Sequence, residues 1–281
     1  MGIMRGGERV ARSADHKGLI AAMDVHQIKI DRAKLAAMPE TERVLLLLLA
    51  HASNELNVLT KLILMMRKNV PPSQIIDHVE AGQTFIFMRL LIGKLHEAWE
   101  LFKARAQSDH AISTTFLPKL PSDAAKALTA LKKHFGPGSA LTAIRNKVSF
   151  HYTDRENLTE ANFQQLAAAE PLQFYLTATV GNCFYHAGEL VAQLSAINLM
   201  KPPPAAPHDT RSAEARKLDA LCTEIIQVSG DMTELFYDLI VLLGQDVADS
   251  VSTETLPDGP KLSTFTLPYF VEYPPQSKIG P

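Results

Sequence analysis

The amino-acid sequence predicts an all-α protein: an antiparallel helical bundle with a C-terminal helical extension and an extended tail. Two observations favour this class. Apolar residues recur at alternating steps of three and four along residues 41–69 and again along residues 74–106, which is the period of one face of an α-helix. The chain of 281 residues is also 46% apolar, which is ordinary for a packed globular protein of this size.

The first stretch predicts a long helix that begins near Thr41. Pro39 and the acidic residues that follow it are typical of a helix N-terminus. Pro71 and Pro72 end the helix, because proline lacks an N–H donor and restricts the residue before it. The apolar stripe of this helix consists of Leu45, Leu49, Ala52, Leu56, Leu59, Ile63 and Met66.

The second stretch predicts a helix from about Gln74 to Ala106. Since only a short Pro-Pro turn separates the two helices, we expect them to form an antiparallel hairpin. The apolar stripe of the second helix consists of Phe85, Met88, Ile92, Leu95, Trp99 and Phe102.

Beyond the hairpin the sequence predicts shorter helices, which are separated by segments rich in Pro, Gly and Ser. Ser122, Ser139 and Thr159 are candidate N-caps, because a side-chain hydroxyl at that position accepts a hydrogen bond from the first helical turn. The expected helices cover residues 122–135, the segment after Ser139, residues 157–170 and residues 182–200. Residues 171–180 remain ambiguous and are compatible with a short extended piece.

The C-terminal part predicts one or two further helices over residues 211–249, with Gly230 as the break in the second case. From Val251 the chain is rich in Pro, Thr and Ser, and we expect an extended arm that packs on the body or on a second subunit. The Pro-rich segment 202–207 is the candidate boundary. The expected division is an N-terminal segment 1–40, a helical bundle 41–200, a helical extension 201–250 and an extended tail 251–281.

Composition excludes several classes of protein. The formal net charge is −2, so a nucleic-acid site would have to be a local basic patch. Cys183 and Cys222 lack disulfide or zinc spacing, and we expect reduced core residues. The N-terminus has no apolar signal region, and the longest apolar run, Val44–Ala50, is far shorter than a bilayer span. We therefore expect a cytoplasmic protein with no membrane partner, no metal and no other cofactor.

The stretch IRNKVSFHYTD, residues 144–154, carries the candidate chemistry. Arg145 offers a permanent charge and a planar fork of donors that matches phosphate oxygens. His151 can take and return a proton near neutral pH, and Asn146 can hold a phosphate oxygen or orient the histidine. These groups suffice to cleave RNA without a metal, with His151 deprotonating the ribose 2′-hydroxyl and Arg145 stabilising charge on the phosphate.

Helical geometry separates the two main groups. On a regular helix Arg145 and His151 lie about 120° and about 9 Å apart. Two arrangements bring them together. The helix ends near His151 and frees the imidazole, or a two-fold dimer places two copies of the motif around one cleft.

The spacing of Arg145, Asn146 and His151 on a late helix that follows a two-helix hairpin resembles the HEPN superfamily (higher eukaryotes and prokaryotes nucleotide-binding), nearest to its bacterial abortive-infection (AbiU-like) branch. The resemblance covers residues 41–200. It implies an all-α bundle, a homodimer, and a metal-independent endoribonuclease of a toxin–antitoxin or phage-defence system with a separately encoded antitoxin. Some members of the family have lost catalysis and only bind or scaffold.

Polar residues on the hairpin are candidates for a supporting role. His51 and Glu55 share one helix face, and they form either an inter-helix hydrogen-bond network or a support that orients Arg145 or His151. Glu97 either neutralises Arg145 or, like Arg89, faces water. The segment HEAWE, residues 96–100, starts like a zinc-binding helix but lacks the second histidine.

Lys132, Lys133 and Lys147 form with Arg145 the local basic cluster that an RNA backbone would need. The rival interpretation is a non-catalytic helical interaction or scaffold protein. In that case Arg145 pairs with a carboxylate of the hairpin, His151 caps a helix end, and the tail docks a partner or a twin subunit.

Overall fold

The computed structural model describes residues 23–66, 73–149, 172–204, 208–257, 264–265 and 267–272. These residues are mostly helical, as the sequence predicts, and they include one two-stranded antiparallel sheet. The α-helices are α1 Arg32–Ala37, α2 Glu40–Met65, α3 Gln74–Phe102, α4 His110–Thr115, α5 Ser122–His134, α6 Ala140–Ile144, α8 His186–Asn198 and α9 Ala213–Gly244. The π-helices are η1 Lys103–Gln107 and η3 Arg145–Ser149, the 3₁₀ turns are η2 Leu117–Lys119 and η4 Val180–Asn182, and the strands are β1 Met23–Ile30 and β2 Ala248–Leu256.

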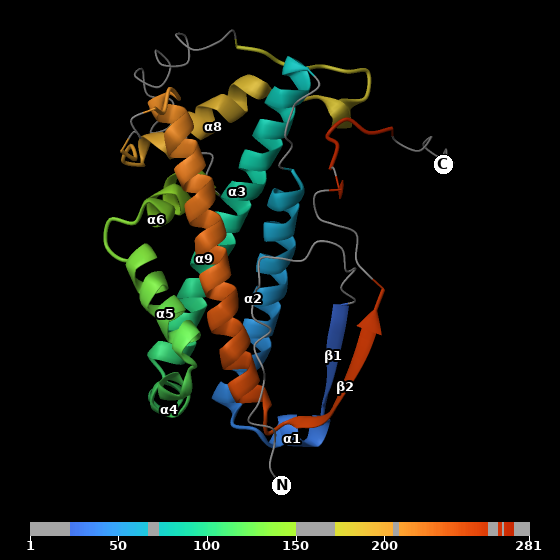
Figure 1. Cartoon of the computed structure of the whole chain (residues 1–281), viewed down its shortest axis with the longest axis vertical. Helices are drawn as coiled ribbons and strands as arrows, with labels where there is room; N and C mark the ends of the chain where they lie inside the picture. The colour runs from blue at the N-terminus through green and yellow to red at the C-terminus, as the bar shows by residue number, and fades with distance from the viewer. Residues whose placement is uncertain are drawn as a thin grey trace, which may run out of the picture.

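The predicted hairpin is present, because α2 and α3 pack side by side along the long axis of the molecule (Figure 1). The predicted stripes are buried: Leu45 and Leu49 of α2 are fully enclosed, as is Phe102 of α3. Burying one such side chain contributes about 1.5–3 kcal/mol. Ser73 caps α3 by accepting a hydrogen bond from the Ile76 amide at 3.2 Å.

Helix α9 is part of the same core and not an appendage to it. It packs against α2, α3 and α5 (Figure 1), and Phe236 and Leu239 are fully buried among residues of α2 and α3. The hydroxyls of Thr60 and Ser229 join α2 to α9 at 2.7 Å. The Pro-rich segment therefore connects two parts of one core, so the expected boundary at residue 201 does not separate the bundle from an extension. Gly230 does not break α9.

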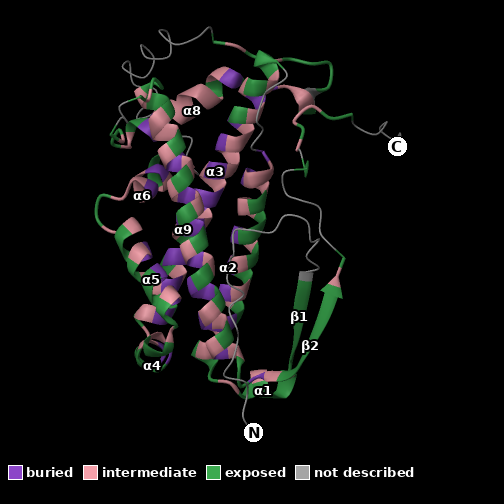
Figure 2. Cartoon of the chain, viewed as in Figure 1, coloured by how far each residue is buried: buried purple, intermediate pink, exposed green. Residues whose placement is uncertain are grey.

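The strands β1 and β2 were not expected. They pair in antiparallel register from Met23 opposite Leu256 to Ile30 opposite Ala248, so the expected N-terminal segment and the expected tail meet in one ribbon. The register places Asp24 beside Thr255 and His26 beside Thr253, and both pairs form side-chain hydrogen bonds. The ribbon is exposed, in contrast to the buried faces of the helices (Figure 2).

The end of the described tail packs on the body, one of the two arrangements that the sequence allows. The Tyr269 hydroxyl donates to the Cys183 carbonyl at 2.6 Å. Asn182 exchanges two hydrogen bonds with the backbone of Val271, at 2.8 and 3.1 Å. These contacts anchor the tail beside the segment that leads into α8.

Of the three expected N-caps, one is confirmed, one is wrong and one lies outside the described residues. Ser139 caps α6 through the Thr142 amide at 3.3 Å, as predicted. Ser122 is the first residue of α5 and Pro121 takes the cap position, so that prediction was wrong by one residue. Thr159 and the helix expected over residues 157–170 lie outside the described residues.

Two absences concern the described part of the chain. Cys183 and Cys222 are half-buried there and form no disulfide, and of the two Cys222 packs against the helical core. No helix in the same ranges is both long and apolar enough to cross a bilayer.

Candidate functional site

The candidate motif lies where a short α-helix changes into a π-helix. Helix α6 covers Ala140–Ile144 and continues directly into η3, Arg145–Ser149. A π-helix bonds each residue to the fifth along the chain and therefore widens the turn, and such segments occur frequently at functional sites. Ile144 and Val148 point inward and are buried. Arg145 is thereby held at the rim of the core and Asn146 is exposed.

Arg145 is charged and half-buried, and it has no counter-ion among the residues that the structure describes. Its Nη1 donates to the Asn146 Oδ1 at 3.0 Å, while its buried Nε finds no acceptor among the described residues. None of the ion pairs in the described ranges involves Arg145. The carboxylate partner from the hairpin that the rival interpretation requires is therefore missing there. A half-buried charge without a partner is costly, which favours an anion as its ligand.

His151 lies outside the described residues, together with all of residues 150–171. The expected pairing of Arg145 with His151 is therefore untested, as is the expected helix end near the histidine. The expected angle of about 120° between the two residues assumed a regular α-helix. Arg145 instead begins a π-helix, so that assumption does not hold for this segment.

The helix that packs against the motif carries a different histidine. His96 lies on α3, which packs against η3. Its side chain is 15% exposed, and its Nε2 lies 4.0 Å from the Glu100 Oε1. Its Nδ1 is buried and has no hydrogen-bond partner among the described residues. We call Arg145, Asn146 and His96 the Arg145 site.

The charges around His96 favour its neutral form. Burial is the largest cause of its lowered pKa, and the positive charge of Arg145 is the second. The carboxylate of Glu100 opposes this shift, and the ammonium of Lys103 adds to it. Glu100 itself pairs with Lys103 at 2.8 Å. Burial and the positive charge of Arg145 therefore both favour the neutral imidazole of His96.

An aromatic contact completes the surroundings of His96. The ring of Phe135, at the C-terminal end of α5, meets the imidazole edge-on at 6.2 Å and stacks on Trp99 at 5.4 Å. The end of α5 and η3 therefore approach the same part of α3. The last turn of α5 carries Lys132 and Lys133, which are exposed, and Lys147 is exposed on η3. These three lysines are consistent with the expected basic cluster.

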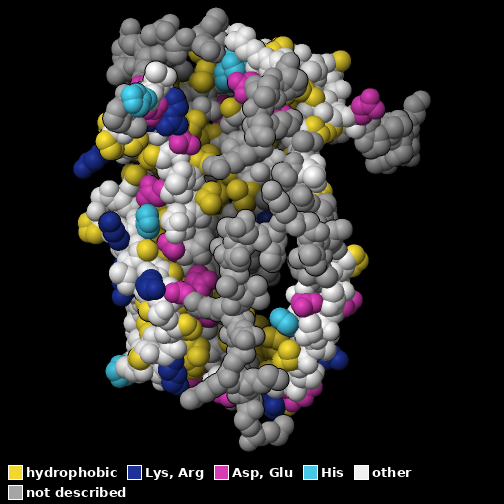
Figure 3. Space-filling model, in the orientation of Figure 1, with side chains coloured by type: hydrophobic (Ala, Val, Ile, Leu, Met, Phe, Trp, Pro, Cys, Tyr) yellow, Lys and Arg dark blue, Asp and Glu magenta, His cyan; other side chains and the backbone are white. Residues whose placement is uncertain are grey.

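The surface charge is mixed over the region. Along the flank formed by α5 and α6, Lys and Arg side chains alternate with Asp, Glu and His side chains (Figure 3). The flank is therefore no continuous basic stripe, and affinity for RNA would depend on a few positions such as Arg145.

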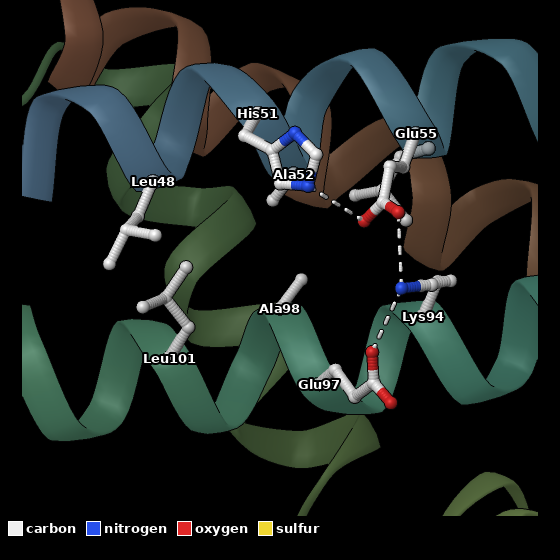
Figure 4. A pocket seen from close by; sticks show the side chains of 9 residues that line it. Leu48, His51, Ala52, Glu55, Lys94, Glu97, Ala98 and Leu101 are labelled. Atoms are coloured by element: carbon white, nitrogen blue, oxygen red, sulfur yellow. Dashed lines mark ion pairs between the residues drawn. The ribbon is translucent and has the colours of Figure 1, made fainter.

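The other predicted support residues gather elsewhere, in a groove between α2 and α3 (Figure 4). Lys94 lies between two carboxylates, 3.1 Å from Glu55 and 3.2 Å from Glu97. His51 lies 3.9 Å from Glu55 and its side chain is 72% exposed. The hydrogen bond that Lys94 donates to Glu55 is the main cause of the raised pKa of Lys94, and the one that it donates to Glu97 is the second.

This arrangement decides between the two roles considered for these residues. Glu55 and Lys94 form the inter-helix network, while Glu97 is half exposed and pairs with Lys94 and not with Arg145. The groove holds two adjoining pockets of about 250 and 460 Å³, both lined by His51, Glu55 and Lys94. His51, Glu55 and Glu97 are therefore candidates for a separate surface and not for support of Arg145.

A second polar cluster joins α3 to the segment before α8. The rings of His78 and His186 stack at 4.3 Å, and the His78 Nδ1 lies 2.6 Å from the Tyr175 hydroxyl. Arg89 donates to both carboxylate oxygens of Glu189, at 3.2 and 2.9 Å. Arg89 is 18% exposed, so the expectation that it faces water was wrong.

Burial dominates at this ion pair. The pKa of Glu189 is raised, because loss of water around the carboxyl outweighs the opposing charge and hydrogen bond of Arg89. In the described part of the chain, no three His, Cys, Asp or Glu side chains gather as a metal ion would require. The cluster is consistent with a structural role in holding α8 against α3.

Comparisons of the chain with protein-family models, with curated proteins and with solved structures found no match in any of the three. The geometry of the Arg145 site therefore has to carry the functional argument.

Proposed function

We propose that this chain is a metal-independent endoribonuclease of the HEPN type, which acts in a bacterial defence or toxin–antitoxin system. One observation supports the proposal most: Arg145 is half-buried, donates to Asn146, and has no carboxylate partner among the described residues. An arginine that serves only to tie helices together normally has such a partner. The free donors of Arg145 fit two oxygens of a phosphodiester.

The proposed reaction needs no metal. His151 takes the proton of a ribose 2′-hydroxyl, and the 2′-oxygen attacks the adjacent phosphorus. The bond from phosphorus to the 5′-oxygen breaks, and this oxygen leaves with a proton returned by the imidazolium or by water. Arg145 stabilises the charge that grows on the non-bridging oxygens, and Asn146 orients the guanidinium. The products are a 2′,3′-cyclic phosphate and a 5′-hydroxyl.

The partners follow from this proposal. The substrate is RNA, held also by Lys132, Lys133 and Lys147. A homodimer would place two copies of the motif around one cleft, and a separately encoded antitoxin would restrain the activity in the cytoplasm.

The alternative function is that of a non-catalytic helical interaction protein. The groove between α2 and α3 favours it, because apolar side chains of Val58, Leu59 and Leu90 line the larger pocket, and Val58 is 57% exposed. In this alternative the Arg145 site takes no part in catalysis. Only the nuclease function therefore predicts that an Arg145 substitution abolishes RNA cleavage.

Expression in a bacterial host separates the two functions. We expect wild-type protein to arrest growth, and Arg145→Gln and His151→Ala to relieve the arrest. Arg105→Gln is the matched control, because Arg105 is also an arginine in a π-helix but is exposed and distant in sequence from the motif; it should remain toxic. Equal growth with all four proteins would count against the nuclease and favour the interaction protein.

A further inference from the structure

His96 is a mostly buried histidine on a helix that packs against η3. Its side chain is only 15% exposed. Its Nδ1 is buried and has no hydrogen-bond partner among the described residues. The nearest carboxylate oxygen to its Nε2 is that of Glu100 at 4.0 Å, which is too far for a hydrogen bond. Within the described part of the chain, Nε2 thus has no acceptor at hydrogen-bond distance.

The charges that act on His96 come from three elements. Glu97 and Glu100 of α3 favour the imidazolium, whereas Lys103 of η1 and Arg145 of η3 disfavour it. The end of α5 contributes the uncharged ring of Phe135, and the preceding His134 is paired with Glu224 of α9 at 3.1 Å. Arg145 is thus the strongest charge that acts against protonation of His96, and none of the ion pairs in the described ranges involves Arg145.

We propose that His96 is a further anion-binding residue of the Arg145 site, which takes up a proton from solvent when a phosphodiester binds to Arg145 and then donates to that phosphodiester through Nε2. The inference rests on the proposed function only in the identity of the ligand, an RNA phosphodiester. It does not require that the RNA is cleaved.

The coupling follows from electrostatics. A bound phosphodiester neutralises the charge of Arg145 and so removes one of the causes that keep His96 neutral. The phosphate oxygen also offers Nε2 an anionic acceptor, and hydrogen bonds of this kind favour the charged form. Binding and protonation must then strengthen each other by the same factor, since coupling between two binding events is reciprocal. The pKa of His96 rises when the ligand binds, and the ligand binds more tightly at low pH.

The test uses 2′-O-methyl hexauridylate, which has no 2′-hydroxyl to attack and whose phosphodiesters keep their charge over the pH range of histidine titration. The imidazole resonances of His96 are followed by NMR from about pH 5 to about pH 8, with the full-length protein free and saturated. We expect the His96 midpoint to move to higher pH on binding, and affinity to tighten by about tenfold at the acidic end. A midpoint that stays or falls overturns the proposal, as does failure of the hexanucleotide to bind at any pH.

Variants provide a second measurement. His96→Gln should lose the tightening of binding in acid. His110→Gln, at an exposed histidine of α4, should keep the tightening. A His96→Gln protein that retains the full pH dependence contradicts the proposal, and should this variant fold poorly, the wild-type resonances decide alone. Wild-type protein that shows the midpoint shift but leaves unmodified RNA intact would support the inference and refute the nuclease.

Discussion

Arg145 and His96 show what a single sequence can and cannot reveal at the scale of a residue. Arg145 and Asn146 are adjacent in the chain, so their chemistry was visible in the motif. His96 comes 49 positions before Arg145 in the printed sequence, and only the folded structure shows that its helix α3 packs on η3. One signal was available: His96 precedes Trp99 by three positions and so shares its inward face.

Folding should make His96 a source of acid sensitivity. Because the folded pKa lies below the ordinary value of 6.5, the unfolded chain binds more protons between these two values. Stability contributed by the neutral imidazole is therefore present above pH 6.5 and declines as the pH falls toward the folded pKa. We expect urea unfolding to show a smaller loss of stability in acid for His96→Gln than for wild type. His51→Gln, at a side chain that is 72% exposed, should match wild type, and an unchanged acid loss in His96→Gln would contradict the burial of His96.

At the scale of an element, the helices were predictable where the pattern was local. Apolar residues at alternating steps of three and four predicted α2 and α3, because this spacing places them on the helix face that is buried. Ser139 predicted the start of α6, because it caps that helix. The π-helices η1 and η3 were not predicted, since their residues fit an α-helix equally well. Helix α9 was predicted, but its place in the common core was not. A Pro-rich segment has the same sequence pattern whether it links two domains or two helices of one core.

Two glycines in helices should respond oppositely to substitution by alanine. A Cβ at Gly82 of α3 would overlap the ring of Phe184, whereas a Cβ at Gly230 of α9 would meet nothing within 4 Å. We expect Gly82→Ala to cost about 1–3 kcal/mol by overpacking. Gly230→Ala should gain about 0.5–1 kcal/mol, because alanine loses less backbone freedom in a helix.

Chemical unfolding of the two variants measures both effects. A neutral or stabilising Gly82→Ala would mean that Phe184, and the segment before α8 that carries it, does not pack closely on α3. A destabilising Gly230→Ala would mean that α9 is more crowded at this position than its surroundings indicate.

At the scale of the whole molecule, the structure consists of a helical core with an exposed ribbon that joins distant parts of the chain (Figure 1). The sequence did not reveal the ribbon, because its strands are separated by more than 200 residues and have mixed polarity instead of an apolar face. A two-stranded ribbon without such a face is only marginally stable by itself.

The ribbon should therefore open far more often than the core. We expect hydrogen exchange of peptides from Met23–Ile30 and Ala248–Leu256 to be fast and equal in rate, because each strand protects the other. Peptides from the buried centre of α9 should exchange slowly, near the limit set by global unfolding. Slow exchange of the ribbon in the full-length protein would show that it is covered in solution.

The central proposal for the whole molecule is that Arg145 and His151 cut RNA without a metal ion. The most direct measurement incubates the purified protein with cellular RNA in excess EDTA and determines the chemical ends of the fragments. We predict 2′,3′-cyclic phosphate and 5′-hydroxyl ends from wild type and from Arg105→Gln, and a rate at least about 100-fold lower for Arg145→Gln. Intact RNA with the wild-type protein, or equal cleavage by Arg145→Gln, would contradict the account.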